Sequence, residues 1–228
     1  FIFKATIADN EQDDRNSMPF NLKALQDLTK LYPGKTMLKD HRRTADNQIA
    51  RIYDTELVQS ANKLTELGEL HTELVAKIYM IKTDSNKDLI SEIVGGIKKE
   101  VSTSTVPQKM VCNICGVDNM KTYCRHFPGY EYDTSDSNGK AIKKLCKMLL
   151  DGAKEAYELS FVAVPAQPRA GTHKSIGFTK PVAETENDTK SIENGVDDTK
   201  KTKIDELDER VLNARFKTAE SFFYANKN

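Results

Sequence analysis

The chain has 228 residues, enough for one sizeable domain or two small ones, and we expect one domain plus an appendage. Hydrophobic residues make up only 38% of it and charged residues 30%, so part of the chain is expected to be solvated. Basic and acidic residues both total 34, which argues against a general affinity for nucleic acid or anionic membranes. No apolar run approaches the roughly 18 residues of a spanning helix, and no signal-peptide pattern is present, so we expect a cytosolic protein.

Apolar and polar residues alternate in many short segments rich in β-forming side chains, which predicts several strands. The expected strands are residues 1–8, 35–40, 49–58, the second half of 69–82, the segment around Ser102, 144–151 and 155–164. The last two are expected to form a hairpin, because the Asp151-Gly152 pair between them is a common hairpin dipeptide. Polar, turn-rich composition predicts loops at 9–19, 42–48 and 129–139.

Two helices are predicted from apolar residues at helical spacing. The first follows Asn21, a good N-cap, and ends at Pro33-Gly34. The second is expected to be capped by Asp84-Ser85, and it carries Leu89, Ile90, Ile93, Val94 and Ile97 on one face. The expected fold is therefore α+β, with a small antiparallel sheet curled toward a barrel and flanked by the two helices.

The C-terminal quarter of the chain has a different composition. Residues 172–203 are rich in Thr, Asp, Glu, Asn and Lys, which predicts a flexible linker after a domain at 1–171. Residues 204–228 carry an apolar stripe on a charged helix, which a lone tethered helix cannot bury. We therefore expect this amphipathic helix to dock on its own domain, on a second copy or on a partner, and we expect a homo-oligomer.

A Cys/His pattern predicts a structural zinc site in a loop at residues 112–126. Two residues separate Cys112 from Cys115, and one residue separates Cys124 from His126. Thiolates and imidazole suit a tetrahedral zinc ion, and four protein ligands leave no open position for a substrate. Cys146 is an alternative fourth ligand to His126. A nucleic-acid-binding role for this loop is a weaker reading, because few basic residues flank it.

A serine and a histidine suggest hydrolytic chemistry, although weakly. A hydroxyl such as that of Ser102 attacks a carbonyl only when a base, here His41, takes its proton. Serine is ordinary on the exposed face of a strand, and the chain has four histidines, so this pair alone does not establish an enzyme.

The order of five motifs is more specific than the pair. The motifs are an apolar helix ending in YPGK, a short segment to Asp40-His41, IARI at 49–52, EVS at 100–102, and ELSFVAVPA at 158–166. In this order they resemble the prohead maturation proteases of tailed bacteriophages, relatives of the herpesvirus capsid protease assemblin. The resemblance includes a branch from Gram-positive phages and prophages in which the serine is followed by Cys-x-x-Cys-Gly and Cys-x-His. It covers roughly residues 1–170.

The resemblance implies an assemblin-like fold and a serine endopeptidase that processes capsid and scaffold proteins within the assembling prohead, in the host cytoplasm. It implies His41 as general base, Ser102 as nucleophile and Glu158 as the group that orients the imidazole. Relatives usually follow the serine with a β-branched residue and glycine, whereas Thr103 is followed here by Ser104, which becomes a rival nucleophile. The alternative is a catalytically degenerate assembly or scaffolding protein that docks through its C-terminal helix. Neither nucleic acid nor a membrane is expected as a partner.

Overall fold

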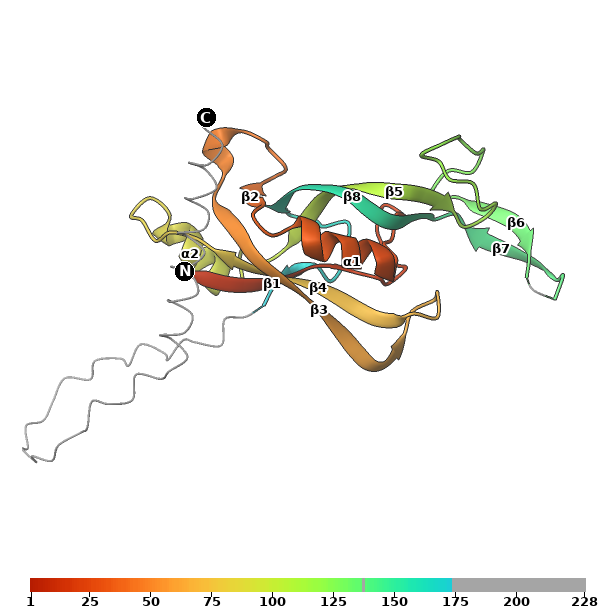
Figure 1. Cartoon of the computed structure of the whole chain (residues 1–228), viewed down its shortest axis with the longest axis horizontal. Coiled ribbons are helices and arrows are strands. Elements are labelled where there is room, and N and C mark those ends of the chain that lie inside the picture. The colour runs from red at the N-terminus through yellow and green to blue at the C-terminus, as the bar shows by residue number, and fades with distance from the viewer. Residues whose placement is uncertain (137, 174–228) are drawn as a thin grey trace, which may run out of the picture. The chain divides into compact units, whose positions relative to one another are not determined.

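The computed structural model describes residues 1–136 and 138–173, which form a curled β-sheet with two α-helices (Figure 1). The sheet has seven strands in the order β5-β8-β2-β3-β4-β1-β9. Their bounds are β1 Ile2–Asp9, β2 Thr36–Lys39, β3 Ala50–Leu64, β4 Leu70–Tyr79, β5 Val101–Cys112, β8 Met148–Phe161 and β9 Gly171–Thr172. The remaining elements are α1 Leu22–Leu31, a short 3₁₀-helix at Ala45–Asn47, α2 Lys87–Val94, and a separate pair of strands, β6 Glu131–Ser135 and β7 Ala141–Leu145. The predicted C-terminal helix, and the predicted linker after residue 173, lie outside the described residues.

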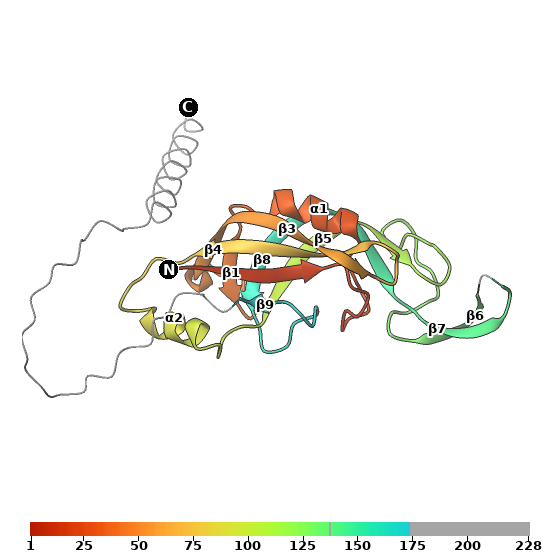
Figure 2. The same ribbon diagram turned by 90° about the horizontal axis from the view of Figure 1, so that it is seen from below.

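The sheet curls until its two ends meet at one corner (Figure 2). β9 pairs with β1 at one end of the sheet, and Gly171 of β9 also forms a bridge with Glu100, immediately before β5 at the other end. The Thr172 N–H donates to the Lys99 carbonyl over 2.7 Å, and the Val101 N–H donates to the Ala170 carbonyl over 3.4 Å. The described part of the chain is therefore an α+β half-barrel, as the sequence predicted in outline.

The prediction of an antiparallel sheet is wrong for one pair of strands. β2 runs parallel to β8, with Thr36 opposite Glu158 and Lys39 opposite Phe161. It runs antiparallel to its other neighbour, β3. Because β3 and β8 run in opposite directions, a short strand inserted between them must be parallel to one of them. The parallel pairing places the end of β2, which His41 follows, beside the end of β8.

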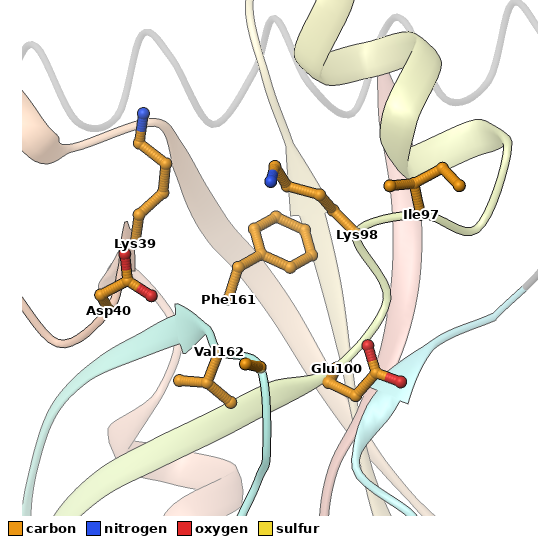
Figure 3. A pocket seen from close by; sticks show the side chains of 8 residues that line it. Lys39, Asp40, Ile97, Lys98, Glu100, Phe161 and Val162 are labelled. Atoms are coloured by element: carbon orange, nitrogen blue, oxygen red, sulfur yellow. The ribbon is translucent and has the colours of Figure 1, made fainter.

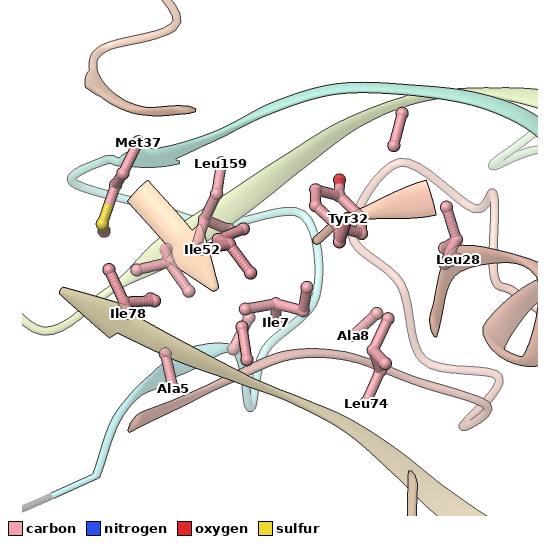
Figure 4. Packing of buried hydrophobic residues seen from close by; sticks show 14 of the residues in the cluster. Ala5, Ile7, Ala8, Leu28, Tyr32, Met37, Ile52, Leu74, Ile78 and Leu159 are labelled. Carbon is pink, nitrogen blue, oxygen red and sulfur yellow. The ribbon is translucent and has the colours of Figure 1, made fainter. Parts of the chain in front are cut away.

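Helix α1 covers the concave face of the sheet and supplies much of the core. Its N-cap is Asn21, whose side-chain oxygen accepts the Ala24 N–H over 2.9 Å, as the sequence predicted. Leu25 and Leu28 are fully buried, and Tyr32, the C-cap, is buried with them (Figure 4). The core cluster also contains Ile7, Met37, Ile52, Leu74, Ile78 and Leu159.

The hairpin expected at Asp151-Gly152 is wrong, because β8 runs straight through this position. Asp151 pairs with Lys109 and Ala153 with Pro107, so the residues on both sides of Gly152 pair with the same strand, β5. Gly152 has φ +69°, a left-handed conformation that glycine adopts without strain, and the register shifts just beyond it. The chain bulges here and does not reverse.

Four other features differ from those expected. α2 begins after Asn86 instead of Ser85, and the Asn86 side-chain oxygen accepts the Thr83 N–H instead of capping the helix. The helix ends at Val94, so Ile97 lies outside it. β3 continues to Leu64, six residues beyond the expected 58, and β6 occupies part of the loop predicted at 129–139.

Candidate functional site

His41 lies in a left-handed turn immediately after β2. Asp40 and His41 have φ values of 55° and 53°, a region that residues other than glycine rarely adopt. The Asp40 N–H donates to the Phe161 carbonyl over 2.9 Å, and the Asn47 side chain donates to the Lys39 carbonyl over 2.7 Å. Both sides of the turn are thus held, and unfavourable backbone conformations of this kind concentrate at functional sites.

Glu158 is the carboxylate that His41 contacts. The Nδ1 atom of His41 lies 2.8 Å from Oε1 of Glu158, whose residue is only 1% exposed. The other oxygen, Oε2, accepts the Ser160 hydroxyl over 2.6 Å, and Ser160 Oγ accepts the His41 N–H over 3.1 Å. Both carboxylate oxygens are therefore bound, as a buried charge requires. Nε2 remains the nitrogen of His41 without a hydrogen-bond partner among the described residues.

The register of β5 on β8 places two serines on the same face as this carboxylate. Ser102 is opposite Ser160, and Ser104 is opposite Glu158. Directly opposed residues of antiparallel strands project from the same face of a sheet. Ser104 Oγ accepts a 2.6 Å hydrogen bond from Arg43, whereas no hydrogen bond joins Ser102 to His41.

The structure therefore joins two of the three predicted catalytic residues, His41 and Glu158, and puts the third, Ser102, on the adjacent strand. Sequence reasoning did not assign roles to Ser160 or Arg43. The Glu-x-Ser spacing was the available signal for Ser160, because residues two apart on a strand share a face.

Tyr32 lies on the opposite side of the same strands. Its hydroxyl donates to the Glu158 carbonyl over 3.4 Å, and Figure 4 shows it pointing from the core toward β5 and β8. Burial, and then the charge of Glu158, raise the pKa of Tyr32 well above its usual range, so the hydroxyl stays protonated. The pairing of β5 shifts register just after Ser104, and Tyr32 supports the strands at this bulge.

Two pockets adjoin this group of residues. The larger, of about 370 Å³, lies beside the His41 turn (Figure 3). Its lining comprises Lys39, Asp40, Ile97, Lys98, Glu100, Phe161, Val162 and Ala163. The smaller, of about 220 Å³, lies beside Ser102, Thr103, Ser104 and Thr105 on β5. Ser102 itself lines the smaller pocket.

The predicted zinc ligands form a cluster at the far end of β5. The ligand atoms of Cys112, Cys115, Cys124 and His126 all lie within 4.8 Å of one another. Cys112 Sγ is 3.7 Å from His126 Nδ1. Tetrahedral bonds of about 2.3 Å to sulfur and 2.1 Å to nitrogen would separate neighbouring ligand atoms by about 3.6 to 3.8 Å. This donor set fits a structural metal ion.

Cys146, the alternative ligand, is not part of the four-residue group. Its sulfur lies 4.0 Å from that of Cys112, and it is fully buried in a small cluster with Cys112 and Met148. The geometry therefore favours His126 as the fourth ligand.

The surroundings of Cys124 favour its thiolate, the form that binds a metal ion. Burial alone favours its neutral thiol, but hydrogen bonds from His126 and Asn119 outweigh this and lower the pKa of Cys124 to about 6. The Asn119 amide lies 3.5 Å from Cys124 Sγ, and its oxygen accepts the Cys124 N–H over 3.1 Å. Outer contacts of this kind orient metal ligands, and no sequence pattern indicated Asn119.

Comparisons with family models, curated proteins and solved structures found no match to this chain. Within residues 1–136 and 138–173, no helix is long and apolar enough to cross a membrane.

Proposed function

We propose that this protein is a serine endopeptidase of the prohead maturation type, with Ser102 as nucleophile, His41 as general base and Glu158 as the orienting carboxylate. The observation that carries the proposal is the 2.8 Å contact between His41 and the buried carboxylate of Glu158, beside the strand that presents Ser102. The two residues are 117 positions apart in sequence, and their contact supports the roles that the resemblance implies for them. The half-barrel with two helices supports an assemblin-like fold.

The residues have distinct roles in the proposed reaction. Ser102 Oγ attacks the carbonyl carbon of the scissile bond, while Nε2 of His41 takes its proton and then delivers it to the leaving amine. The resulting acyl-enzyme is hydrolysed by water, with His41 again acting as base. Glu158 binds the Nδ1–H, which fixes the tautomer and stabilises the imidazolium. Catalytic hydrogen bonds are often long in a free enzyme and tighten with substrate, so Ser102 reaches His41 in the complex.

The proposed substrates are capsid and scaffold proteins inside the immature head in the host cytoplasm, where the chain acts as a homo-oligomer. The Cys/His cluster holds a structural zinc ion, which is the metal that prefers a tetrahedral site of three thiolates and one imidazole. The ion takes no part in the reaction, because its four protein ligands leave no open position.

A fluorophosphonate probe tests the proposal, because it labels only an activated serine. The expected result is stoichiometric labelling, mapped by mass spectrometry to Ser102, which is lost in Ser102→Ala and in His41→Ala. Ser104→Ala is the matched control: it removes the neighbouring hydroxyl on the same strand face and should remain labelled. Labelling at Ser104 would reassign the nucleophile.

A folded protein that takes no label, and does not process co-expressed capsid protein, would instead be the degenerate assembly factor. The hydrogen bonds of the two serines favour this second candidate. Ser102 makes no hydrogen bond to His41 in the structure, and the Ser104 hydroxyl accepts a hydrogen bond from Arg43.

A further inference from the structure

The smaller pocket, of about 220 Å³, is built from three segments that are far apart in sequence. One wall is the start of β5, from Ser102 to Thr105. The other walls are the loop after β1, which contributes Asp14, Asn16, Met18 and Phe20, and the segment before β9, which contributes Ala166, Gln167 and Ala170. Ile7 and Leu150 complete its lining. The pocket thus opens beside the proposed nucleophile.

Contacts between the two loops keep this pocket formed. The Arg15 N–H donates to the Ala166 carbonyl over 2.9 Å, and the Arg15 guanidinium donates to the Pro165 carbonyl over 2.6 Å. Arg169 contributes a second tie, because it binds Asp9 over 2.7 Å and Asp13 over 2.6 Å. The walls are therefore fixed before any ligand arrives, which lowers the entropy lost on binding.

Asp14 is the one charged residue among those that line the pocket. It is 91% buried, since its exposed fraction is 9%. Its Oδ1 accepts the N–H groups of Asn16 over 2.9 Å and Met18 over 3.0 Å. Its Oδ2 has no hydrogen-bond partner among the described residues. Burial raises the pKa of Asp14, because the charged form loses part of its solvent, and this outweighs the hydrogen bonds from Met18 and Asn16; a cation in the pocket would relieve the remaining cost.

We propose that this pocket binds a lysine or arginine side chain of the protein substrate next to the scissile bond, with Asp14 as its ion-pair partner. The proposal rests on the function proposed above and adds the class of sequence that is cleaved. Ile7, Phe20 and Leu150 provide apolar walls for the methylene stem, and the carboxylate receives the charged end. The volume is below the roughly 300 Å³ at which small-molecule sites begin, so it suits one side chain.

The backbone of β5 offers the rest of the binding surface. Val101 directs its N–H away from β8, toward Ala170. Backbone groups alternate in direction along an antiparallel strand, so Thr103 also directs its N–H and C=O away from β8, beside the pocket. An extended peptide can pair with these groups while one of its side chains enters the pocket.

The larger pocket does not carry a similar inference. Its lining contains two lysines, Lys39 and Lys98, and two acids, Asp40 and Glu100, so its charge does not select one kind of ligand.

Binding to full-length protein carrying Ser102→Ala tests the proposal without turnover. Fluorescein-labelled ten-residue peptides of alanine and serine, with a single central lysine, methionine or glutamate, serve as probes in fluorescence anisotropy. We expect the lysine peptide to bind at least about tenfold more tightly than the methionine peptide, because hydrogen bonds to charged groups are the stronger ones. Adding Asp14→Asn should remove this difference.

The asparagine variant suits the test because its side-chain oxygen can still accept the N–H groups of Asn16 and Met18. Asp133→Asn, on β6, is the matched control, since it removes the same charge away from the pocket and should keep the lysine preference. Equal affinities for lysine and methionine, a preference for glutamate, binding of none of the peptides, or a lysine preference that persists in Asp14→Asn would each overturn the proposal. Fluorophosphonate labelling of Ser102 is a separate readout, so failure of the pocket and failure of the protease are distinguishable.

Discussion

The two ends of β5 position side chains in different ways. At its start, Ser102 lies over a large core, and the nearby His41 and Glu158 are held by a network of buried hydrogen bonds. At its end, about 30 Å away at the usual rise of a strand, Cys112 belongs to a cluster with only Cys146 and Met148 fully buried. One strand thus connects a site held by packing and buried hydrogen bonds to a Cys/His cluster whose donors fit a metal ion.

The difference between the two ends of β5 indicates that a metal ion at the Cys/His cluster would take the place of a hydrophobic core. Where the half-barrel supplies a core, packed strands and buried hydrogen bonds hold a carboxylate and a histidine in contact. The arm that carries β6 and β7 buries too little apolar surface to fix its loops, since β7 is exposed along its whole length. A bound ion stabilises such a segment because binding and folding are coupled.

Glu158→Gln should give the largest effect on peptide hydrolysis, because it disrupts the site at the start of β5. The amide can keep a hydrogen bond to His41, but it cannot fix the correct tautomer or stabilise an imidazolium. We expect peptide hydrolysis to fall about 10⁴-fold, by analogy with the aspartate of the serine protease triad. Glu155→Gln, an exposed residue on the same strand, is the control and should retain activity. Full activity in Glu158→Gln would exclude this carboxylate from the mechanism.

Cys112→Ser removes one of the four proposed zinc ligands at the end of β5. Purified wild-type protein should contain about one zinc per chain by mass spectrometry, and the variant should lose it, because four ligands are needed to close the site. Hydrogen exchange should then accelerate in residues 112–147 while α1 stays protected. Cys146→Ala should retain zinc, which separates the two candidate ligand sets. Loss of zinc in Cys146→Ala, but not in His126→Ala, would reverse the assignment.

Arg169→Gln tests how far ion pairs stabilise the half-barrel, because the Arg169 guanidinium joins the loop before β9 to Asp9 and Asp13. Asp9 is 1% exposed and loses its charged partner, but the Arg169 side chain is 34% exposed, so we expect a loss of about 1 to 3 kcal/mol of unfolding free energy. Urea denaturation measures the loss, and a change below about 1 kcal/mol would show that solvent replaces the pair.

The effect of Arg169→Gln should also depend on pH. A hydrogen bond from Arg169 lowers the pKa of Asp13, so this carboxylate adds stability above its unfolded pKa and loses it as pH falls through the folded value. The gap between wild type and variant should therefore narrow on acidification.

Tyr32→Phe is the mildest change and separates support of the strands from catalysis. It removes the hydroxyl that donates to the Glu158 carbonyl while keeping the buried ring. We expect a loss of about 1 kcal/mol in thermal or urea unfolding and little change in hydrolysis. Loss of hydrolysis without loss of stability would instead place the hydroxyl in the reaction.

The sequence predicts local features of this fold better than its long-range contacts. Helix α1 is evident because Asn21 and its leucines act within a few residues of one another. The Asp151-Gly152 signal fails because pairing with β5 overrides a local turn preference. The contact between His41 and Glu158 joins strands distant in sequence, so only the order of motifs pointed to it. Asp14 gave no signal, because its role depends on three segments that fold together.

The left-handed turn at Asp40 and His41 has a consequence for the evolution of this protein. Glycine at position 40 would relieve the backbone there, so a screen for heat resistance should favour Asp40→Gly by a few tenths of a degree to a few degrees. The same substitution would make the turn that positions the His41 imidazole more flexible. Selection for turnover and selection for durability should therefore choose opposite residues at this position.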